Sequence, residues 1–192
     1  MSEQAIKKIL ITGANGFIGG SLMRYYQNHG QDTVGVDLIG NDDDIAEGDI
    51  SQPDTISQQL QECDVIIHTA ALVSNAMQDS DMWQVNVLAT RNLIQAAKEH
   101  KVRRFVQISS IVAYGNSAEG ELDETHPVHA DGGSYVLTKL ASEHVVLSEQ
   151  TKDDIEVVII RPGDAYGPGS RPWIIAPCLL YTSDAADEGF CV

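Results

Sequence analysis

The fold is decided by the stretch Lys7-Lys-Ile-Leu-Ile-Thr-Gly-Ala-Asn-Gly-Phe-Ile-Gly19, in which a short apolar strand runs directly into three glycines spaced three residues apart. Gly13 permits a tight turn, and Gly16 lets backbone amides approach an anion closely. Gly19 lets the following helix pack against the strand. The N-terminus of that helix favours phosphate oxygens, because it carries unpaired N–H groups and the positive end of the helix dipole. The stretch therefore predicts a cradle for the pyrophosphate of a dinucleotide.

The residues after the glycines favour the same interpretation. Phe17–Asn28 predicts a helix, and Thr33–Val36 begins a second apolar strand that ends at Asp37. A carboxylate at this place accepts hydrogen bonds from both ribose hydroxyls of NAD and repels the extra phosphate of NADP. The glycine spacing differs by one residue from the better-known G-x-G-x-x-G, so an ordinary strand, loop and helix with an acidic turn is the alternative. The joint pattern favours NAD.

Composition excludes several classes of protein. The chain has 192 residues, of which 43% are apolar, and this is the size of one domain with a substantial core. A formal net charge of -16 argues against nucleic acid as a partner. Residues 1–4 lack the features of a secretion signal, and no apolar run approaches the roughly 18 residues that cross a bilayer. Three cysteines without a C-x-x-C pair indicate neither a disulfide framework nor a zinc site. We expect a cytoplasmic protein with no metal, membrane or nucleic acid partner.

Short apolar runs alternate with helical stretches along the rest of the chain. Further strands are predicted at Val65–His68, Arg104–Ile108 and Glu156–Ile160. Helices are predicted at Pro53–Glu62, Met82–Lys98 and Tyr135–Glu149. This alternation is typical of an α/β fold in which helices cover both faces of a parallel sheet.

The last fifteen residues depart from this pattern. From Cys178 onward the sequence shows neither an amphipathic period nor a helix cap, and it resembles read-through at the end of an incomplete reading frame. We therefore expect one domain over residues 1–177, followed by a spurious or non-native tail over residues 178–192. A genuine but divergent C-terminus is the alternative.

A second pattern pairs Tyr135 with Lys139, four residues later on the same face of a predicted helix. A phenol titrates at about pH 10, so acid–base work at neutral pH calls for a pKa lowered by about 2 to 3 units. A neighbouring ammonium acts in that direction, and it could also bond the nicotinamide ribose. Ser110 would hydrogen-bond the substrate oxygen whose proton Tyr135 exchanges. By itself the pair could equally be a surface Tyr and Lys of an amphipathic helix.

Together these motifs resemble the extended branch of the short-chain dehydrogenase/reductase superfamily, also called the NAD-dependent epimerase/dehydratase family. The resemblance covers residues 5 to about 177. Its further motifs are Gly48-Asp49-Ile50, His68-Thr-Ala-Ala71, Val85-Asn86-Val87, Ser109-Ser110 with Ala113-Tyr114-Gly115, and Arg161-Pro162-Gly163 with Tyr166-Gly167-Pro168. It implies a Rossmann-type doubly wound parallel sheet with helices on both faces. It also implies a smaller C-terminal substrate domain that is largely missing here.

The resemblance assigns roles to particular residues. Asn86 would join Ser110, Tyr135 and Lys139 as a catalytic residue, by holding a water molecule or a backbone geometry that relays protons to Lys139. A plain helix-surface position is the alternative for Asn86, and His68 is expected to be structural rather than a base. The implied cofactor contacts are Gly13, Asn15, Gly16, Phe17, Ile18, Gly19, Asp37, Asp49, Ile50, Ala70, Ala71, Tyr135, Lys139 and Pro162, with Asp49 and Ile50 at the adenine and no metal.

The implied activity is that of an NAD-dependent oxidoreductase. Tyr135 would take the hydroxyl proton of a secondary alcohol, sugar-like or hydroxysteroid-like, while hydride passes to C4 of the nicotinamide. Dehydratases of the family carry Asp-Glu directly after the serine or threonine position, whereas this chain has Ile111-Val112. Sugar dehydration is therefore disfavoured, because two apolar side chains cannot move protons. A nucleotide-sugar 4-epimerase and a catalytically silent NAD-binding module or sensor are the alternatives.

Family members pair through the helices that carry Asn86 and Tyr135, so the resemblance also implies a homodimer. Most of the substrate pocket in these relatives comes from residues after the stretch corresponding to Tyr166-Gly167-Pro168. The polypeptide could therefore bind NAD without turning over a substrate.

Overall fold

The computed structural model describes residues 5–41, 44–73, 78–115, 120–150, 154–170, 174–175 and 177–179. The chain divides into two units, Met1–Arg161 and Pro162–Val192, and each is described by itself. The expected domain end at residue 177 stays a prediction. Of the expected tail, Cys178 and Leu179 fall within the described residues and the rest lies outside them.

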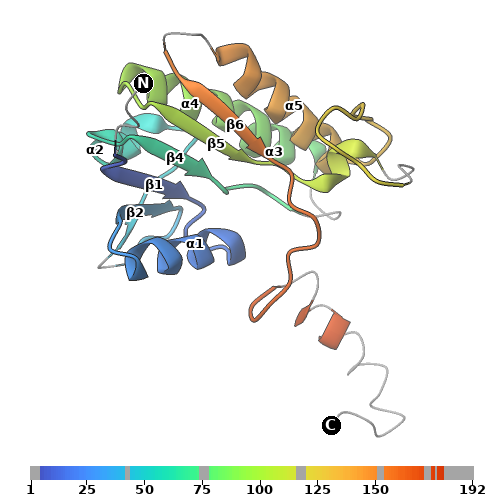
Figure 1. The fold of residues 1–192 in the computed structure, drawn as a ribbon, viewed down its shortest axis with the longest axis horizontal. Coiled ribbons are helices and arrows are strands. Elements are labelled where there is room, and N and C mark those ends of the chain that lie inside the picture. Colours follow the sequence, from blue (N-terminus) through green and yellow to red (C-terminus); the bar gives the residue numbers. More distant parts are fainter. Residues whose placement is uncertain are drawn as a thin grey trace, which may run out of the picture. The chain divides into compact units, whose positions relative to one another are not determined.

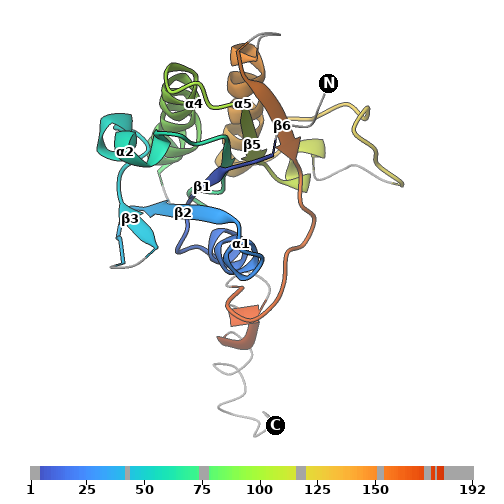
Figure 2. The ribbon, with the colours of Figure 1, turned by 60° about the vertical axis from the view of Figure 1, so that its left-hand side comes forward.

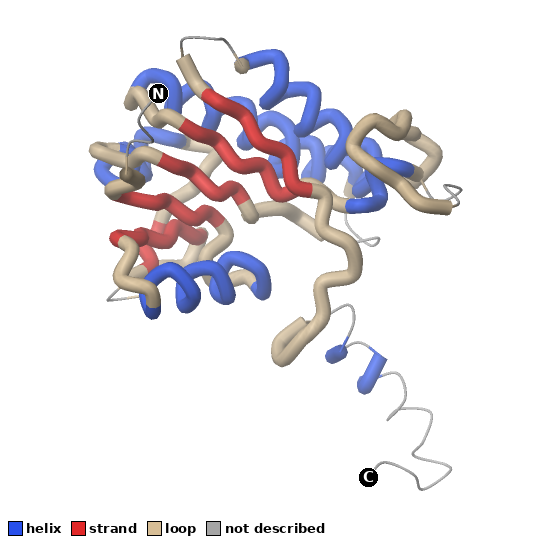
Figure 3. The backbone as a smooth tube through the Cα atoms, viewed as in Figure 1, coloured by secondary structure: helices blue, strands red, loops and turns tan. Residues whose placement is uncertain are grey.

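Six parallel strands form one sheet in the described part of the first unit, in the order β3-β2-β1-β4-β5-β6 (Figures 1 and 3). The order runs outward in both directions from the boundary between β1 and β4, so the loops after these two strands diverge and leave a crevice at their carboxyl ends. The predicted doubly wound parallel sheet is confirmed. The strands are β1 (Lys8–Thr12), β2 (Asp32–Asp37), β3 (Ile45–Glu47), β4 (Val65–His68), β5 (Arg104–Ile108) and β6 (Glu156–Ile160).

Helices cover both faces of the sheet, with α1 on one face and α2, α4 and α5 on the other (Figures 1 and 2). A π-helical segment, η2, joins α3 to α4 without a break. The α-helices are α1 (Phe17–Asn28), α2 (Ser57–Leu60), α3 (Asp79–Trp83), α4 (Thr90–Glu99) and α5 (Ser134–Glu149). The other helical segments are η1 (Pro53–Ile56), η2 (Gln84–Ala89) and η3 (Ile111–Tyr114).

Successive residues of a strand point to opposite faces of the sheet, so the strands contribute to two apolar clusters, one on each face. These clusters hold the helices against the sheet. On the side of α2, α4 and α5 the buried core includes Leu10, Ile66, Leu93, Phe105 and Val146. On the side of α1 it includes Ile9, Ile11, Met23, Val65 and Ile67. The crevice therefore sits on a sheet buried on both faces.

The second unit shows a short turn in its described residues. Gly167 and Gly169 adopt φ values of 151° and 90°. The Ser170 N–H donates to the Gly167 carbonyl over 2.9 Å, and the Ser170 hydroxyl donates to the Ala165 carbonyl over 3.1 Å. Across both units, none of the helices in the described part of the chain is long and apolar enough to span a membrane.

Candidate functional site

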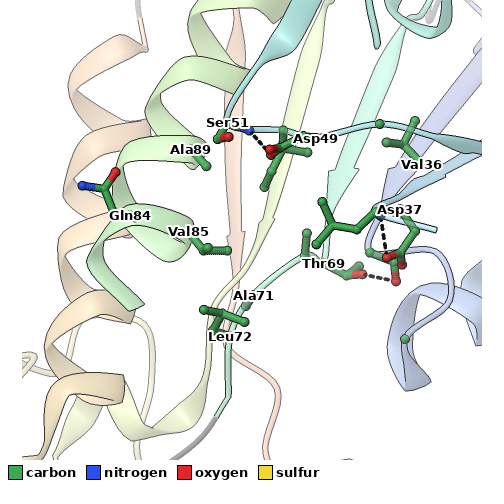
Figure 4. A pocket seen from close by; sticks show the side chains of 16 residues that line it. Val36, Asp37, Asp49, Ser51, Thr69, Ala71, Leu72, Gln84, Val85 and Ala89 are labelled. Carbon is green, nitrogen blue, oxygen red and sulfur yellow. Dashed lines mark hydrogen bonds between the residues drawn. The ribbon is translucent and has the colours of Figure 1, made fainter. Parts of the chain in front are cut away.

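A cavity of about 460 Å³ lies at the carboxyl ends of β1, β2 and β4, where the strand order switches (Figure 4). Cofactor and small-molecule sites typically measure roughly 300 to 1,000 Å³. Seven of the predicted cofactor contacts line the cavity together: Gly13, Gly16, Asp37, Asp49, Ile50, Ala70 and Ala71. These seven residues come from four separate segments, which lie at the end of β2 and after β1, β3 and β4.

Other predicted contacts lie elsewhere. The cavity lining does not include Asn15, Phe17, Ile18, Gly19, Tyr135 or Lys139. Pro162 begins the second unit, so its predicted contact stays a prediction.

The sequence predicts no role for several of the residues that line the cavity. Thr69 and Leu72 follow the carboxyl end of β4, which is where open parallel sheets bind their ligands, so position alone could have indicated them. Gln84, Val85 and Ala89 come from the π-helical segment, and nothing in the sequence pattern predicted that geometry. The remaining members of this set are Val36, Leu38, Gly48 and Ser51.

The glycine turn is packed tightly against the chain that follows β4. Gly13 has φ +69°, and its N–H donates to the Val36 carbonyl over 2.9 Å. A Cβ at Gly13 would lie 2.7 Å from the Ala70 nitrogen. A Cβ at Gly19 would overlap the Gly13 carbonyl oxygen. Both positions therefore require glycine, for the turn and for the close start of α1.

Asp37 stands at the end of β2, on the edge of the cavity (Figure 4). Its carboxylate accepts the Asn15 N–H over 2.9 Å and the Leu38 N–H over 2.8 Å. The Asn15 amide donates to the Ile39 carbonyl over 2.6 Å. Asn15 thus ties the glycine turn to the end of β2. The Asp37 carboxylate keeps further lone pairs for a ligand, since two oxygens accept about four hydrogen bonds.

Asp49 closes a turn on the opposite side of the cavity. Its carboxylate accepts the Ser51 N–H over 2.8 Å, and the Asp49 N–H donates to the Thr55 hydroxyl over 3.0 Å. The hydrogen bonds from Ser51 lower the pKa of Asp49, while partial burial acts in the opposite direction. The charged carboxylate therefore stabilises the turn that presents Ile50. The predicted adenine contact of these two residues stays a prediction.

Lys139 is buried on α5 beneath the end of β5. Its ammonium donates to the Ile108 carbonyl over 3.0 Å and lies 5.9 Å from the centre of the Tyr135 ring. Burial lowers the pKa of Lys139 to about 8, and the charge of Glu143 opposes this effect. The predicted shared face of the two side chains is confirmed.

The expected lowering of the Tyr135 pKa is wrong for the chain by itself. Burial raises the pKa of Tyr135, and a hydrogen bond with Ser110 acts in the opposite direction. Desolvation is the larger of these two effects. Ser110, Tyr135 and Lys139 are nevertheless brought together at the N-terminal part of α5.

Asn86 is buried in η2, with 2% of its surface exposed, so the alternative of a helix-surface position is wrong. Its Oδ1 accepts the Leu72 N–H over 2.7 Å. Its Nδ2 donates to the Leu72 carbonyl over 3.0 Å and to the Thr138 hydroxyl over 3.1 Å. Both amide hydrogens are therefore in use, and the predicted relay of protons to Lys139 stays a prediction.

His68 has the structural character expected of it. It is buried, with Nδ1 lying 2.6 Å from the Thr12 hydroxyl and Nε2 lying 2.9 Å from the Thr90 hydroxyl. Burial, with a contribution from the Lys139 charge, lowers the pKa of His68 to about 3. The imidazole is neutral at physiological pH. Among the described residues, no group of three or more His, Cys, Asp or Glu side chains is arranged to hold a metal ion.

Comparison with known proteins shows which family the chain is similar to. Residues 9–180 match the NAD dependent epimerase/dehydratase family. Sterol demethylase protein B of Methylococcus capsulatus is 33% identical over 187 residues, which are 89% of this chain and 56% of that protein. UDP-glucose 4-epimerase of Vibrio cholerae is 33% identical over 180 residues, which are 86% of this chain and 54% of that protein.

A solved structure has the same fold. MoeE5 in complex with UDP-glucuronic acid and NAD superimposes with a TM-score of 0.81 at 31% identity, covering 91% of this chain and 60% of that chain. The chain spans 61% and 56% of two curated relatives that it matches.

The tight packing of the glycine turn predicts a specific loss of stability in Gly13→Ala. Both Gly13 and Gly30 have φ near +70°, but a Cβ at Gly30 would meet no atom within 4 Å. Gly30→Ala should cost about 1 to 2 kcal/mol for the left-handed backbone alone. Gly13→Ala should cost about 1 to 3 kcal/mol more, because its methyl group overlaps Ala70. Urea unfolding followed by circular dichroism measures both, and equal losses would contradict the close approach.

Proposed function

The chain belongs to the NAD dependent epimerase/dehydratase family, and on this basis we propose that it binds NAD and carries out hydride transfer between the nicotinamide and a secondary alcohol. The alcohol is sugar-like or hydroxysteroid-like. The observation that carries the proposal is the cavity at the strand switch point, which joins the glycine turn, Asp37 and the chain after β4. The relatives' names and the NAD reported with MoeE5 support it.

The residues present fit the cofactor. Gly16 caps α1, and no side-chain hydrogen bond to the cap is found among the described residues, so the first N–H groups of the helix are available to the pyrophosphate. Asp37 would accept the ribose hydroxyls with the lone pairs left by Asn15 and Leu38. Ile50 would contact the adenine. The small side chains of Ala70 and Ala71 leave room for the cofactor beside the glycine turn.

The chemistry follows from the group around α5. When bound, the nicotinamide accepts or returns the hydride. A phenol with its ordinary pKa of about 10 is protonated at neutral pH, and burial raises the pKa of Tyr135 further. Its hydroxyl can therefore donate a proton to the oxygen of a substrate ketone as that ketone is reduced. Lys139 would stabilise the resulting phenolate with its positive charge. Ser110 would orient the substrate oxygen.

Ile111 bears on the choice of reaction. Ile111 directly follows Ser110 and is the first residue of η3. Its side chain is 43% exposed. An apolar side chain at this place gives no acid or base for the elimination of water. Simple alcohol oxidation and reduction is the function favoured, with nucleotide-sugar 4-epimerisation as the second candidate. The similarity to the Vibrio cholerae epimerase and to MoeE5 with its UDP-sugar acid supports a nucleotide sugar as substrate.

A third hypothesis is that the chain binds NAD as a module or sensor without catalysing a reaction. Ser110, Tyr135 and Lys139 weigh against it, because a sensor would be free to lose them. The expected cytoplasmic location stays a prediction.

We also propose that two copies pair through α5 and the helix that contains η2. The outer side of α5 carries Leu137, Ala141 and Val145, none of which is buried. Trp83 and Leu88 are 41% and 42% exposed on the neighbouring helix. Exposed apolar side chains on adjacent helices are typical of a surface that another subunit covers.

Leu137→Glu should therefore convert the dimer to a monomer, because it places a charge in the apolar contact. Ile39→Glu, at a 75% exposed position outside these helices, should remain dimeric. Sedimentation velocity at micromolar concentration measures both. A wild-type chain that sediments as a monomer would contradict the proposed pairing.

Asp37→Ser should weaken NADH binding about tenfold, the factor that corresponds to 1.4 kcal/mol, because the ribose hydroxyls lose a charged acceptor. It should also narrow the preference for NADH over NADPH, since the 2'-phosphate is no longer repelled. Asp32→Ser, at the exposed amino end of β2, is the matched control and should bind as the wild type does. Isothermal titration calorimetry measures the affinities. A wild-type chain that binds neither dinucleotide would overturn the proposed function.

Tyr135→Phe should lower the turnover of NADH with any accepted ketone or nucleotide sugar by about 10²-fold or more, because it removes the proton donor. NADH affinity should stay within about twofold, since the aromatic ring is kept. Tyr25→Phe, on the exposed side of α1, should behave as the wild type. With ketones, NADH absorbance measures turnover; with nucleotide sugars, chromatography of the products measures it, because epimerisation leaves the amount of NADH unchanged. Unchanged turnover in Tyr135→Phe would exclude the phenol as the acid, and NADH binding without any turnover would favour the silent module.

A further inference from the structure

Three of the segments that line the cavity each contain or adjoin a buried polar side chain. The glycine turn follows Thr12, the chain from Thr69 to Leu72 follows His68, and the helical wall around Ala89 is followed by Thr90. Thr12 and Thr90 are each 0% exposed and His68 is 1% exposed. These three residues form one connected group.

Thr12 and His68 are register partners across β1 and β4, the two strands at the switch point. In a parallel pair, such partners point to the same face of the sheet. The Thr12 hydroxyl lies 2.6 Å from His68 Nδ1, and His68 Nε2 lies 2.9 Å from the Thr90 hydroxyl. The imidazole therefore spans from the strand before the glycine turn to the helix on the other side of the cavity.

The direction of each hydrogen bond follows from the donors available. The Thr90 hydroxyl lies 2.9 Å from the Asn86 carbonyl, which can only accept, so we assign the hydroxyl proton to this bond and the acceptor role toward His68 to the hydroxyl oxygen. In this assignment His68 carries its proton on Nε2. Its bare Nδ1 accepts the proton of the Thr12 hydroxyl. This assignment gives both imidazole nitrogens and the Thr90 hydroxyl a partner, and the Nε2–H tautomer is the one that we expect.

The same chain of hydrogen bonds continues to the helix of Tyr135. The Asn86 amide holds both backbone groups of Leu72, which lines the cavity, and it donates to the Thr138 hydroxyl over 3.1 Å. Thr138 in turn donates to the Tyr135 carbonyl over 3.1 Å. One buried network therefore extends from the cofactor turn to the first turn of α5.

We propose that His68 and Thr90 are positioning residues, which fix the glycine turn, the chain after β4 and the helical wall relative to one another through the hydrogen bonds of Thr12, His68, Thr90 and Asn86. The proposal rests on the proposed function, because the cavity that these walls enclose is the NAD site. Apolar residues of similar shape could fill the same space without the cost of burying polar groups. A fully satisfied buried network instead specifies one arrangement of the segments it joins.

The test compares the effect of removing the Thr90 hydroxyl with the effect of removing the Thr90 methyl group. Thr90→Val keeps the size and removes the hydroxyl, which leaves the His68 Nε2–H without an acceptor; Thr90→Ser keeps the hydroxyl and removes the methyl. Thr90→Val should weaken NADH binding about tenfold and Thr90→Ser by no more than about twofold. Thr33→Val is the matched control, since its hydroxyl donates to the Gln31 carbonyl over 2.9 Å at the far end of β2. It should bind NADH as the wild type does.

A second measurement does not depend on the cofactor. Nitrogen-15 NMR of histidine-labelled protein should show His68 as the neutral Nε2–H tautomer between pH 5 and pH 8 in the wild type and in Thr90→Ser. In Thr90→Val this signal should shift, because the proton has lost its acceptor. Thr12→Val and Thr12→Ser provide a second pair with the same expected order of NADH affinity if Thr90→Val fails to fold.

The outcomes distinguish the two proposals. If the wild type binds no NADH, the proposed function fails, while the NMR result still decides whether the network exists. If the wild type binds NADH and Thr90→Val binds it equally well, or if the Val and Ser variants are weakened equally, the positioning role is wrong. A His68 that titrates at about pH 6.5, the ordinary value for histidine, would also overturn it.

Discussion

The close approach between the turn after β1 and the chain after β4 is the constraint on which the rest of the site depends. Gly13 lies so near Ala70 that a Cβ would come within 2.7 Å of the Ala70 nitrogen. Two strands that are neighbours in the sheet but distant in sequence thereby present their loops to one cavity. Asp37 joins them from β2, because its carboxylate accepts the N–H of Asn15 in the glycine turn. The cavity is therefore a product of strand order and of glycine at particular positions.

Charges buried around α5 are balanced within the first unit. Glu143 is 2% exposed and accepts two hydrogen bonds from Arg161, at 2.7 and 3.0 Å. The Arg161 guanidinium also lies 4.7 Å from the centre of the Tyr114 ring. Lys139 stands one helical turn before Glu143, whose charge opposes the effect of burial on the lysine. Removing Glu143 alone would leave the buried Lys139 ammonium and the partly buried Arg161 guanidinium without their carboxylate, which is the costly way to disrupt such a group.

Local pattern predicted much of the fold. The predicted bounds of Phe17–Asn28, Val65–His68, Arg104–Ile108 and Glu156–Ile160 are those of α1, β4, β5 and β6. The short β3 was missed, because three residues carry too little apolar pattern to be recognised. The helix predicted over Met82–Lys98 contains a π-helical segment, and Pro53–Glu62 is divided into η1 and α2.

The sequence by itself determined the alternating strands and helices, the glycine turn, the acidic residue after β2 and the Tyr135–Lys139 pair, because each depends on the spacing of residues near one another in the chain. Only the tertiary structure decided how Asn86 and His68 are used. Their partners, Leu72, Thr12 and Thr90, come from other segments, and burial set the protonation of His68. Burial also reversed the expected direction of the Tyr135 pKa. Desolvation and hydrogen bonds between distant segments exist only once the chain has folded, so no local pattern encodes them.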